Sequence, residues 1–266
     1  MNFLLLVRSA TIVFAVYSLS LVFTGCVTST TGGMPPPSLD EAADLNLQLG
    51  IGYLRKNDLP LAQLKLEKSV DQNPDLIMAH IMLGLVYERL GDNDIAEKSY
   101  RRAVAKGARN PDALNSLAVF LCHSDSGRPE ALDLFDRALR IPQSETFSNK
   151  AMLNTNAGVC MKPVDLPMAE DYLRAALSVE PNFTVALIQL ADVAYQRENY
   201  LQSRAFLERY MGQDEISPPV LWLAVRVEAA MGDVSASNEY GRRLKEEFPG
   251  SVEARLLLER ERDAGT

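Results

Sequence analysis

The chain has 266 residues, a formal net charge of −8, and a composition of 47% hydrophobic and 23% charged residues, which is typical of a folded protein. The acidic balance argues against a nucleic-acid-binding protein, because no cluster of basic residues is present to neutralise phosphates. It argues equally against broad electrostatic attraction to an anionic membrane surface.

Residues 1–25 have the organisation of a secretory signal segment. Arg8 is their only charged residue, and an apolar run interrupted only by Thr and Ser extends from Ala10 to Phe23. The Thr-Gly-Cys sequence that ends at Cys26 resembles the bacterial lipobox, in which the cysteine is lipidated and becomes the mature N-terminus. We therefore predict a lipoprotein signal peptide over 1–25 and lipidation, with palmitate-type acyl chains, at Cys26.

Two other interpretations of this segment stay open, an uncleaved membrane anchor and an ordinary secreted protein. The anchor is disfavoured because no basic stop-transfer cluster follows Cys26. Residues 26–39 are instead Thr-, Gly- and Pro-rich and predict a flexible tether.

Gram-negative lipoproteins retained in the inner membrane tend to carry Asp directly after the lipidated cysteine. This chain has Val27, so the resemblance implies an outer-membrane protein that faces the periplasm.

From about residue 40 the sequence repeats itself every 34 residues. Each unit contains two segments with helical apolar periodicity, joined by a short polar turn. The matching pairs at this spacing are Leu49 and Leu83, Gly50 and Gly84, Tyr53 and Tyr87, and Ala62 and Ala96. Small residues recur where two helices would approach closely, and larger ones fill the space beside them. This is the pattern of the tetratricopeptide repeat.

The pattern continues with weaker matches to residue 249, and a final helix is expected from Val252 to about Asp263. We predict an all-α fold, a right-handed superhelical solenoid of about six tetratricopeptide repeats over 40–250. Residues 251–266 would form a C-terminal capping helix and tail, because the end of a solenoid needs a cover. A generic helical bundle is the alternative.

Motifs for catalysis or cofactor binding are not found. The sequence contains no phosphate-binding or dinucleotide-binding glycine motif and no zinc-type spacing of Cys and His. A nucleophile formed by Cys122 and His123 is disfavoured, because adjacent residues on a helix point in different directions and no third orienting group is evident. We therefore predict a protein-binding protein that is not an enzyme, with no cofactor, no metal site and no small-molecule substrate.

Cys122 and Cys160 remain as an even pair once Cys26 is assigned to lipid. Both lie late in the first helix of consecutive repeats, and stacked first helices run side by side. In an oxidising periplasm this arrangement predicts a disulfide, worth about 3–4 kcal/mol in the chain-entropy model. Two separately buried thiols are the alternative.

Three segments of the repeats are distinctive: NSLAVFLC at 115–122, NTNAGVC at 154–160 and LWLAVRVE at 221–228. They resemble segments of the PilF/PilW family of type IV pilus biogenesis lipoproteins, the pilotins. Ala118 and Ala224 replace glycines of the family pattern. The resemblance implies a protein that binds secretin subunits and promotes their outer-membrane localisation and multimerisation. The alternative is another periplasmic repeat lipoprotein, for β-barrel assembly or for recruitment of cell-wall enzymes.

A binding surface for such a partner is expected on the concave face of the solenoid, which the first helix of each repeat would line. In the first two repeats the outward positions on these helices are Leu47, Ile51, Leu54, Ile81, Leu85 and Glu88. Exposed apolar residues among them would form a groove for an amphipathic segment of the partner. The alternative is that several of them pack between repeats.

Overall fold

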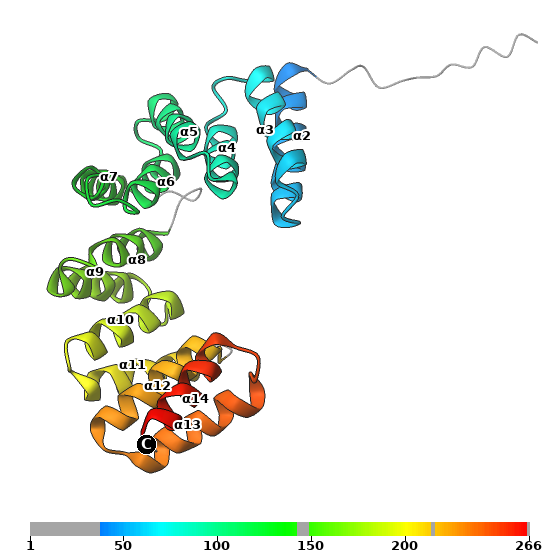
Figure 1. Cartoon of the computed structure of the whole chain (residues 1–266). Coiled ribbons are helices and arrows are strands. Elements are labelled where there is room, and N and C mark those ends of the chain that lie inside the picture. Colours follow the sequence, from blue (N-terminus) through cyan, green and yellow to red (C-terminus); the bar gives the residue numbers. More distant parts are fainter. Residues whose placement is uncertain (1–37, 143–148, 214–215, 265–266) are drawn as a thin grey trace, which may run out of the picture. The chain divides into compact units, whose positions relative to one another are not determined.

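The computed structural model describes residues 38–142, 149–213 and 216–264, and within them it contains thirteen helices and no strand (Figure 1). The predicted signal peptide, Cys26 and the tether lie outside the described residues. The helices are α2 (Leu39–Arg55), α3 (Leu59–Gln72), α4 (Ile77–Leu90), α5 (Asn93–Lys106), α6 (Pro111–Leu121), α7 (Arg128–Arg140), α8 (Lys150–Met161), α9 (Leu166–Val179), α10 (Thr184–Gln196), α11 (Tyr200–Met211), α12 (Pro218–Met231), α13 (Val234–Glu247) and α14 (Val252–Ala264).

Helices α2 to α13 form six consecutive antiparallel hairpins, each made of an even-numbered helix followed by an odd-numbered one. Helix α14 follows the sixth hairpin and packs on both of its helices. The predicted all-α solenoid of six helical repeats with a terminal cap is confirmed.

Local sequence signals place the turns between the helices. In the first hairpin, the Leu61 amide donates a hydrogen bond of 3.3 Å to the Asp58 carboxylate, which caps α3, and Pro60 lies in the first turn of that helix. In the second hairpin, Gly91 ends α4 with a φ of 86°, a left-handed conformation that glycine adopts without steric cost. Asn110, Asn149, Asp165 and Asp233 cap α6, α8, α9 and α13 in the same way as Asp58.

Small residues let the two helices of a hairpin approach closely. A Cβ atom at Gly84 would lie 2.7 Å from the ring of Tyr100, and one at Gly50 would lie 2.5 Å from the side chain of Leu66. Ala96, on the facing helix of the second hairpin, has no exposed surface. The glycine and alanine positions of the repeat are therefore required by packing.

Successive hairpins make two kinds of contact. The second helix of each hairpin packs on the first helix of the next, and the first helices of neighbouring hairpins also contact each other. Among the described residues, the second helices of neighbouring hairpins make no such contact. The first helices therefore form the closely spaced inner row of the solenoid.

The capping helix α14 covers the end of the sixth repeat with only part of its apolar surface. Ala254 and Leu257 are buried against α12 and α13, and Lys245 forms an ion pair of 2.8 Å with Glu261. Leu256 and Leu258, which flank Leu257 in the sequence, remain exposed. A single stripe of α14 thus closes the core at this end.

Candidate partner-binding surface

Three of the residues predicted to face a partner on the inner row are buried instead. Leu47, Leu54 and Ile81 are 9%, 6% and 4% exposed and belong to the cores of the first repeats. The prediction that they point outward is wrong, because they belong to apolar clusters between helices. Leu47 and Leu54 lie in a cluster with residues of α3 and α4, and Ile81 lies in one with residues of α5 and α6. Their burial supports the packing alternative.

The other three predicted residues, Ile51, Leu85 and Glu88, are half-buried. Glu88 accepts a hydrogen bond of 2.8 Å from the Tyr100 hydroxyl and lies 3.6 Å from Nδ1 of His123. Burial and the negative charge of Glu88 raise the pKa of Tyr100. Glu88 is thus held within the second and third repeats, and Ile51 and Leu85 remain as partly accessible aliphatic residues of the inner row.

A more accessible apolar surface lies on a different side of α2, which we call the α2 end face. It is a cleft of about 450 Å³ lined by Leu45, Gln48, Leu49, Gly52, Tyr53 and Lys56. Leu45 and Leu49, one turn apart on α2, are 52% and 48% exposed. These side chains form a short apolar stripe along α2, with Lys56 at one end.

The second repeat explains why this face is apolar. Ala79 and Leu83, which occupy there the positions of Leu45 and Leu49, are 0% and 7% exposed. The hydroxyl of Tyr87, the counterpart of Tyr53, donates a hydrogen bond of 2.6 Å to Glu67 on the preceding helix α3. No described helix covers the same positions on α2. The α2 end face is therefore a helix-packing surface without a described helix against it.

Sequence reasoning missed this surface. Leu49 and Tyr53 match Leu83 and Tyr87 of the second repeat, so the repeat pattern predicts packing residues at both positions. The available signal was their position in the first repeat, where no earlier unit of the pattern supplies a covering helix.

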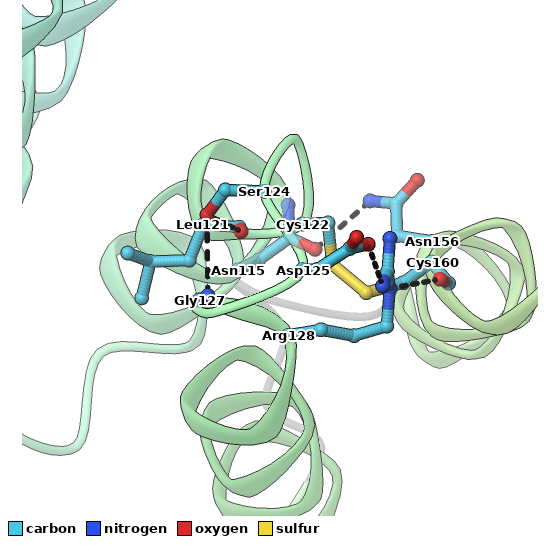
Figure 2. Close-up of a disulfide and its surroundings, with 9 residues drawn as sticks. All are labelled: Asn115, Leu121, Cys122, Ser124, Asp125, Gly127, Arg128, Asn156 and Cys160. Atoms are coloured by element: carbon cyan, nitrogen blue, oxygen red, sulfur yellow. Dashed lines mark hydrogen bonds and ion pairs between the residues drawn. A yellow bond between two sulfur atoms is a disulfide. The ribbon is translucent and has the colours of Figure 1, made fainter. Parts of the chain in front are cut away.

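The junction between the third and fourth repeats contains a disulfide (Figure 2). Cys122 and Cys160 are bonded, with their Cα atoms 5.5 Å apart. Nδ2 of Asn156 donates a hydrogen bond of 2.9 Å to Oδ1 of Asn115 beside it, and Nε of Arg128 donates one of 3.1 Å to the carbonyl oxygen of Cys160. These contacts join α6 and α7 to α8 across the junction.

A smaller cleft of about 240 Å³ lies beside the disulfide. It is lined by Val119, Cys122, His123, Asn156, Val159, Cys160 and Pro163. Because the Cys122 sulfur is bonded to Cys160, it carries no thiol proton for His123 to accept. The His123 ring instead lies edge-on to Phe120, with ring centroids 6.5 Å apart.

No helix in the described part of the chain combines the length and the apolar character needed to cross a bilayer. Over the same residues, no group of three or more His, Cys, Asp or Glu side chains is arranged to hold a metal ion.

Comparison with known proteins agrees with the repeat architecture. A family model described as tetratricopeptide repeat matches residues 81–145. The type IV pilus assembly protein PilF of Pseudomonas aeruginosa is 28% identical over 243 residues, which cover 90% of this chain and 94% of PilF.

Two solved structures are similar along most of the chain. The crystal structure of PilW, described as a widely conserved type IV pilus biogenesis factor, has a TM-score of 0.73 and 26% identity, and the match covers 81% of this chain and 98% of PilW. The structure of Pseudomonas aeruginosa PilF has a TM-score of 0.69 and 25% identity, with 84% and 100% covered.

The fold and the family model define the class, a tetratricopeptide repeat protein whose exposed apolar cleft lies on its first described helix. Within that class, the two relatives confirm the resemblance predicted from the sequence motifs. The chain is a tetratricopeptide repeat protein similar to PilF and PilW along most of its length.

Proposed function

We propose that this chain is a pilotin of type IV pilus biogenesis, an outer-membrane lipoprotein that binds secretin subunits and promotes their outer-membrane localisation and multimerisation. The similarity to PilF over 90% of the chain carries the proposal. The lipobox-like sequence at Cys26 supports it, because a lipid at that position would hold a bound subunit at the bilayer in which it must assemble.

The partner-binding surface in this proposal is the α2 end face. In every later repeat the equivalent side of the first helix is covered by the second helix of the preceding repeat. The geometry of the solenoid therefore favours an amphipathic helix as the occupant, with apolar side chains against Leu45, Leu49 and Tyr53. Ile51 and Leu85, on the inner row, do not line this cleft and would be a separate apolar contact for the partner.

The proposal is tested by the amount of SDS-resistant secretin multimer in outer membranes of a strain that lacks this protein. We expect the multimer to be lost while secretin monomer persists, and to return with the wild-type gene. Cys26→Ser should restore it less well, because the protein would no longer be anchored. Leu49→Asp should fail to restore it, because a charge would be placed in the cleft.

Leu64→Asp provides a matched control. Leu64 is 56% exposed on α3 of the same repeat and does not line the cleft, so its variant should restore multimers like the wild type. Normal multimers in the deletion strain would overturn the pilotin proposal and favour the barrel-assembly or cell-wall alternatives. Equal failure of Leu49→Asp and Leu64→Asp would overturn the assignment of the binding surface.

A further inference from the structure

The sixth repeat contains an arginine, Arg226, for which the described part of the chain supplies no acidic partner. The guanidinium carbon of Arg226, on α12, lies 4.7 Å from the ring centroid of Tyr195 and 5.7 Å from that of Trp222. Its Nε is buried with no hydrogen-bond partner, and no described residue forms an ion pair with it. Of the three guanidinium nitrogens, Nε is the one that is shielded from solvent and has no hydrogen-bond partner. The two Nη atoms are therefore in contact with solvent.

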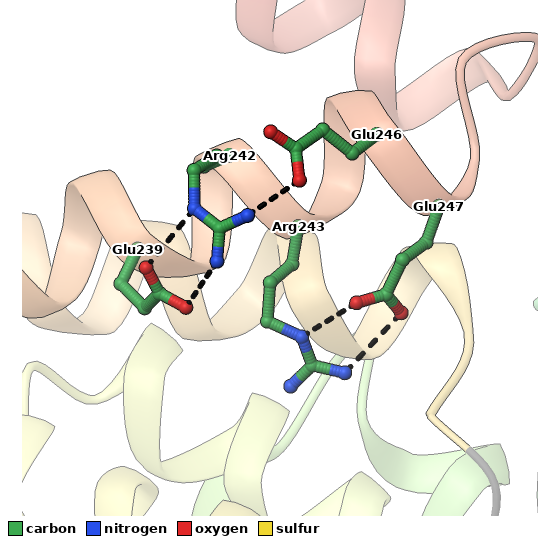
Figure 3. A network of polar contacts seen from close by, with 5 residues as sticks. All are labelled: Glu239, Arg242, Arg243, Glu246 and Glu247. Atoms are coloured by element: carbon green, nitrogen blue, oxygen red, sulfur yellow. Dashed lines mark hydrogen bonds and ion pairs between the residues drawn. The ribbon is translucent and has the colours of Figure 1, made fainter.

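This situation differs from that of Arg204 and Arg242, two other arginines near the C-terminal end of the array. Arg242 on α13 is held by Glu239 at 2.7 Å and by a second glutamate one turn further on (Figure 3). Arg204 is paired with Glu228, which lies on the same helix as Arg226. Among the described residues Arg226 has no such carboxylate partner, and its guanidinium lies against two aromatic rings instead.

The aromatic contacts determine what this guanidinium can bind. The two aromatic rings attract the guanidinium cation and restrict its orientation. The N–H donors at the edge of the guanidinium plane remain available for an acceptor. A carboxylate matches two such donors in one plane, and a half-buried setting strengthens the resulting hydrogen bonds. The Tyr195 and Trp222 rings, from two consecutive repeats, form apolar walls around it.

The local charge favours a carboxylate over a phosphate. Lys162, the residue that follows α8, is already bound to Asp192 at 2.9 Å, on the helix that carries Tyr195. Arg226 itself has one positive charge and no carboxylate partner among the described residues, which matches a singly charged carboxylate better than a doubly charged phosphate. Glu228 and Asp233 on α12 and in the following turn are occupied by Arg204.

We propose that Arg226, between Tyr195 and Trp222, is a binding site for a carboxylate of a protein partner, either an Asp or Glu side chain or a chain terminus. The site lies in the sixth repeat and is separate in sequence from the α2 end face in the first. It does not depend on the identity of the partner that binds α2, and it is tested without a secretin.

The protein offers a direct optical probe of this site, because Trp222 is its only tryptophan. The full chain in detergent is titrated with an acetylated, amidated hexapeptide of alternating Glu and Leu, and with the same peptide in which Gln replaces Glu. Tryptophan fluorescence should report a dissociation constant at least about tenfold lower for the Glu peptide, as charge-assisted hydrogen bonds predict. The preference should weaken as salt is added.

Variants separate the guanidinium from its surroundings. Arg226→Gln should bind the two peptides equally, and Arg226→Lys should lose most of the preference because an ammonium cannot form two coplanar hydrogen bonds. Tyr195→Phe should keep the preference, since the ring remains. Arg242→Gln is the matched control and should behave as the wild type, because Arg242 is already paired with two glutamates.

Three results would overturn the proposal. The first is equal affinity of the wild type for the two peptides. The second is an unchanged preference in a folded Arg226→Gln or Arg226→Lys variant, with folding judged from helical circular dichroism. The third is competition by inorganic phosphate at a lower concentration than acetate, which would make the site a general anion site instead of a carboxylate site.

Discussion

The first and last repeats have the same hairpin architecture but differ in how their outer faces are covered. Leu49, on α2 of the first repeat, is 48% exposed, whereas Leu244, on α13 of the last repeat, is fully buried next to α14. The capping helix closes one end of the core, and no described element closes the other. A repeat without a neighbour therefore leaves its packing surface available, and the α2 end face is such a surface.

The disulfide lies between these two ends, and its removal is expected to have the largest effect on stability. Reduction, or the change Cys122→Ser with Cys160→Ser, should lower the free energy of unfolding by about 3–4 kcal/mol, because a long loop of the unfolded chain is no longer closed. Denaturant unfolding followed by circular dichroism measures this loss.

The single changes Cys122→Ser and Cys160→Ser should act alike, and His123→Ala should have little effect on stability, since His123 is exposed. A loss of function in His123→Ala as severe as in Cys122→Ser would contradict a purely structural role of this pair and reopen the nucleophile hypothesis.

Leu83 and Leu49 test the comparison at matched positions of two repeats. Leu83→Ala should lower the free energy of unfolding by about 3 kcal/mol, because it leaves a cavity between α4 and its neighbours. Leu49→Ala should change it by less than about 0.5 kcal/mol, as expected for an exposed residue. Similar losses for the two variants, measured by urea unfolding, would mean that the α2 end face is covered.

The capped end is tested by Leu257, the buried leucine of α14. Leu257→Ala should cost about 2 kcal/mol, whereas the same change at its exposed neighbour Leu258 should be nearly neutral. Thermal unfolding of the two variants provides the measurement. A neutral Leu257→Ala would show that α14 does not stabilise the last repeat.

The smallest effect is expected for the ion pairs on the surface of α13 (Figure 3). Arg242→Gln should lower the free energy of unfolding by no more than about 0.5–1 kcal/mol, because exposed pairs gain little net energy in water. High salt should reduce the difference from the wild type further. A loss above 2 kcal/mol in denaturant unfolding would indicate a cooperative network.

The hairpins were predictable from sequence because each requires small residues at fixed spacing. Gly84 faces Tyr100 and Gly50 faces Leu66 at distances that admit no larger side chain, so the same spacing recurs in the sequence. These contacts lie within one repeat, where sequence separation determines which residues meet.

The surfaces were harder to predict, because they depend on contacts between repeats. The periodicity of the sequence shows that Leu47 and Leu54 lie on one side of α2, but it does not show that α4 packs against this helix. The sequence alone therefore predicts two exposed residues where the structure has buried ones. The cluster of Tyr195, Trp222 and Arg226 joins two repeats, and no pattern within either repeat indicates it.

Binding of the secretin to the α2 end face is tested most directly by photo-crosslinking in intact cells. A photoreactive amino acid is placed at Leu49 in one strain and at Leu64 in another, and adducts are detected with an antibody against the secretin. We expect a secretin adduct from position 49 and little or none from position 64. No adduct from position 49, or equal adducts from both positions, would contradict it.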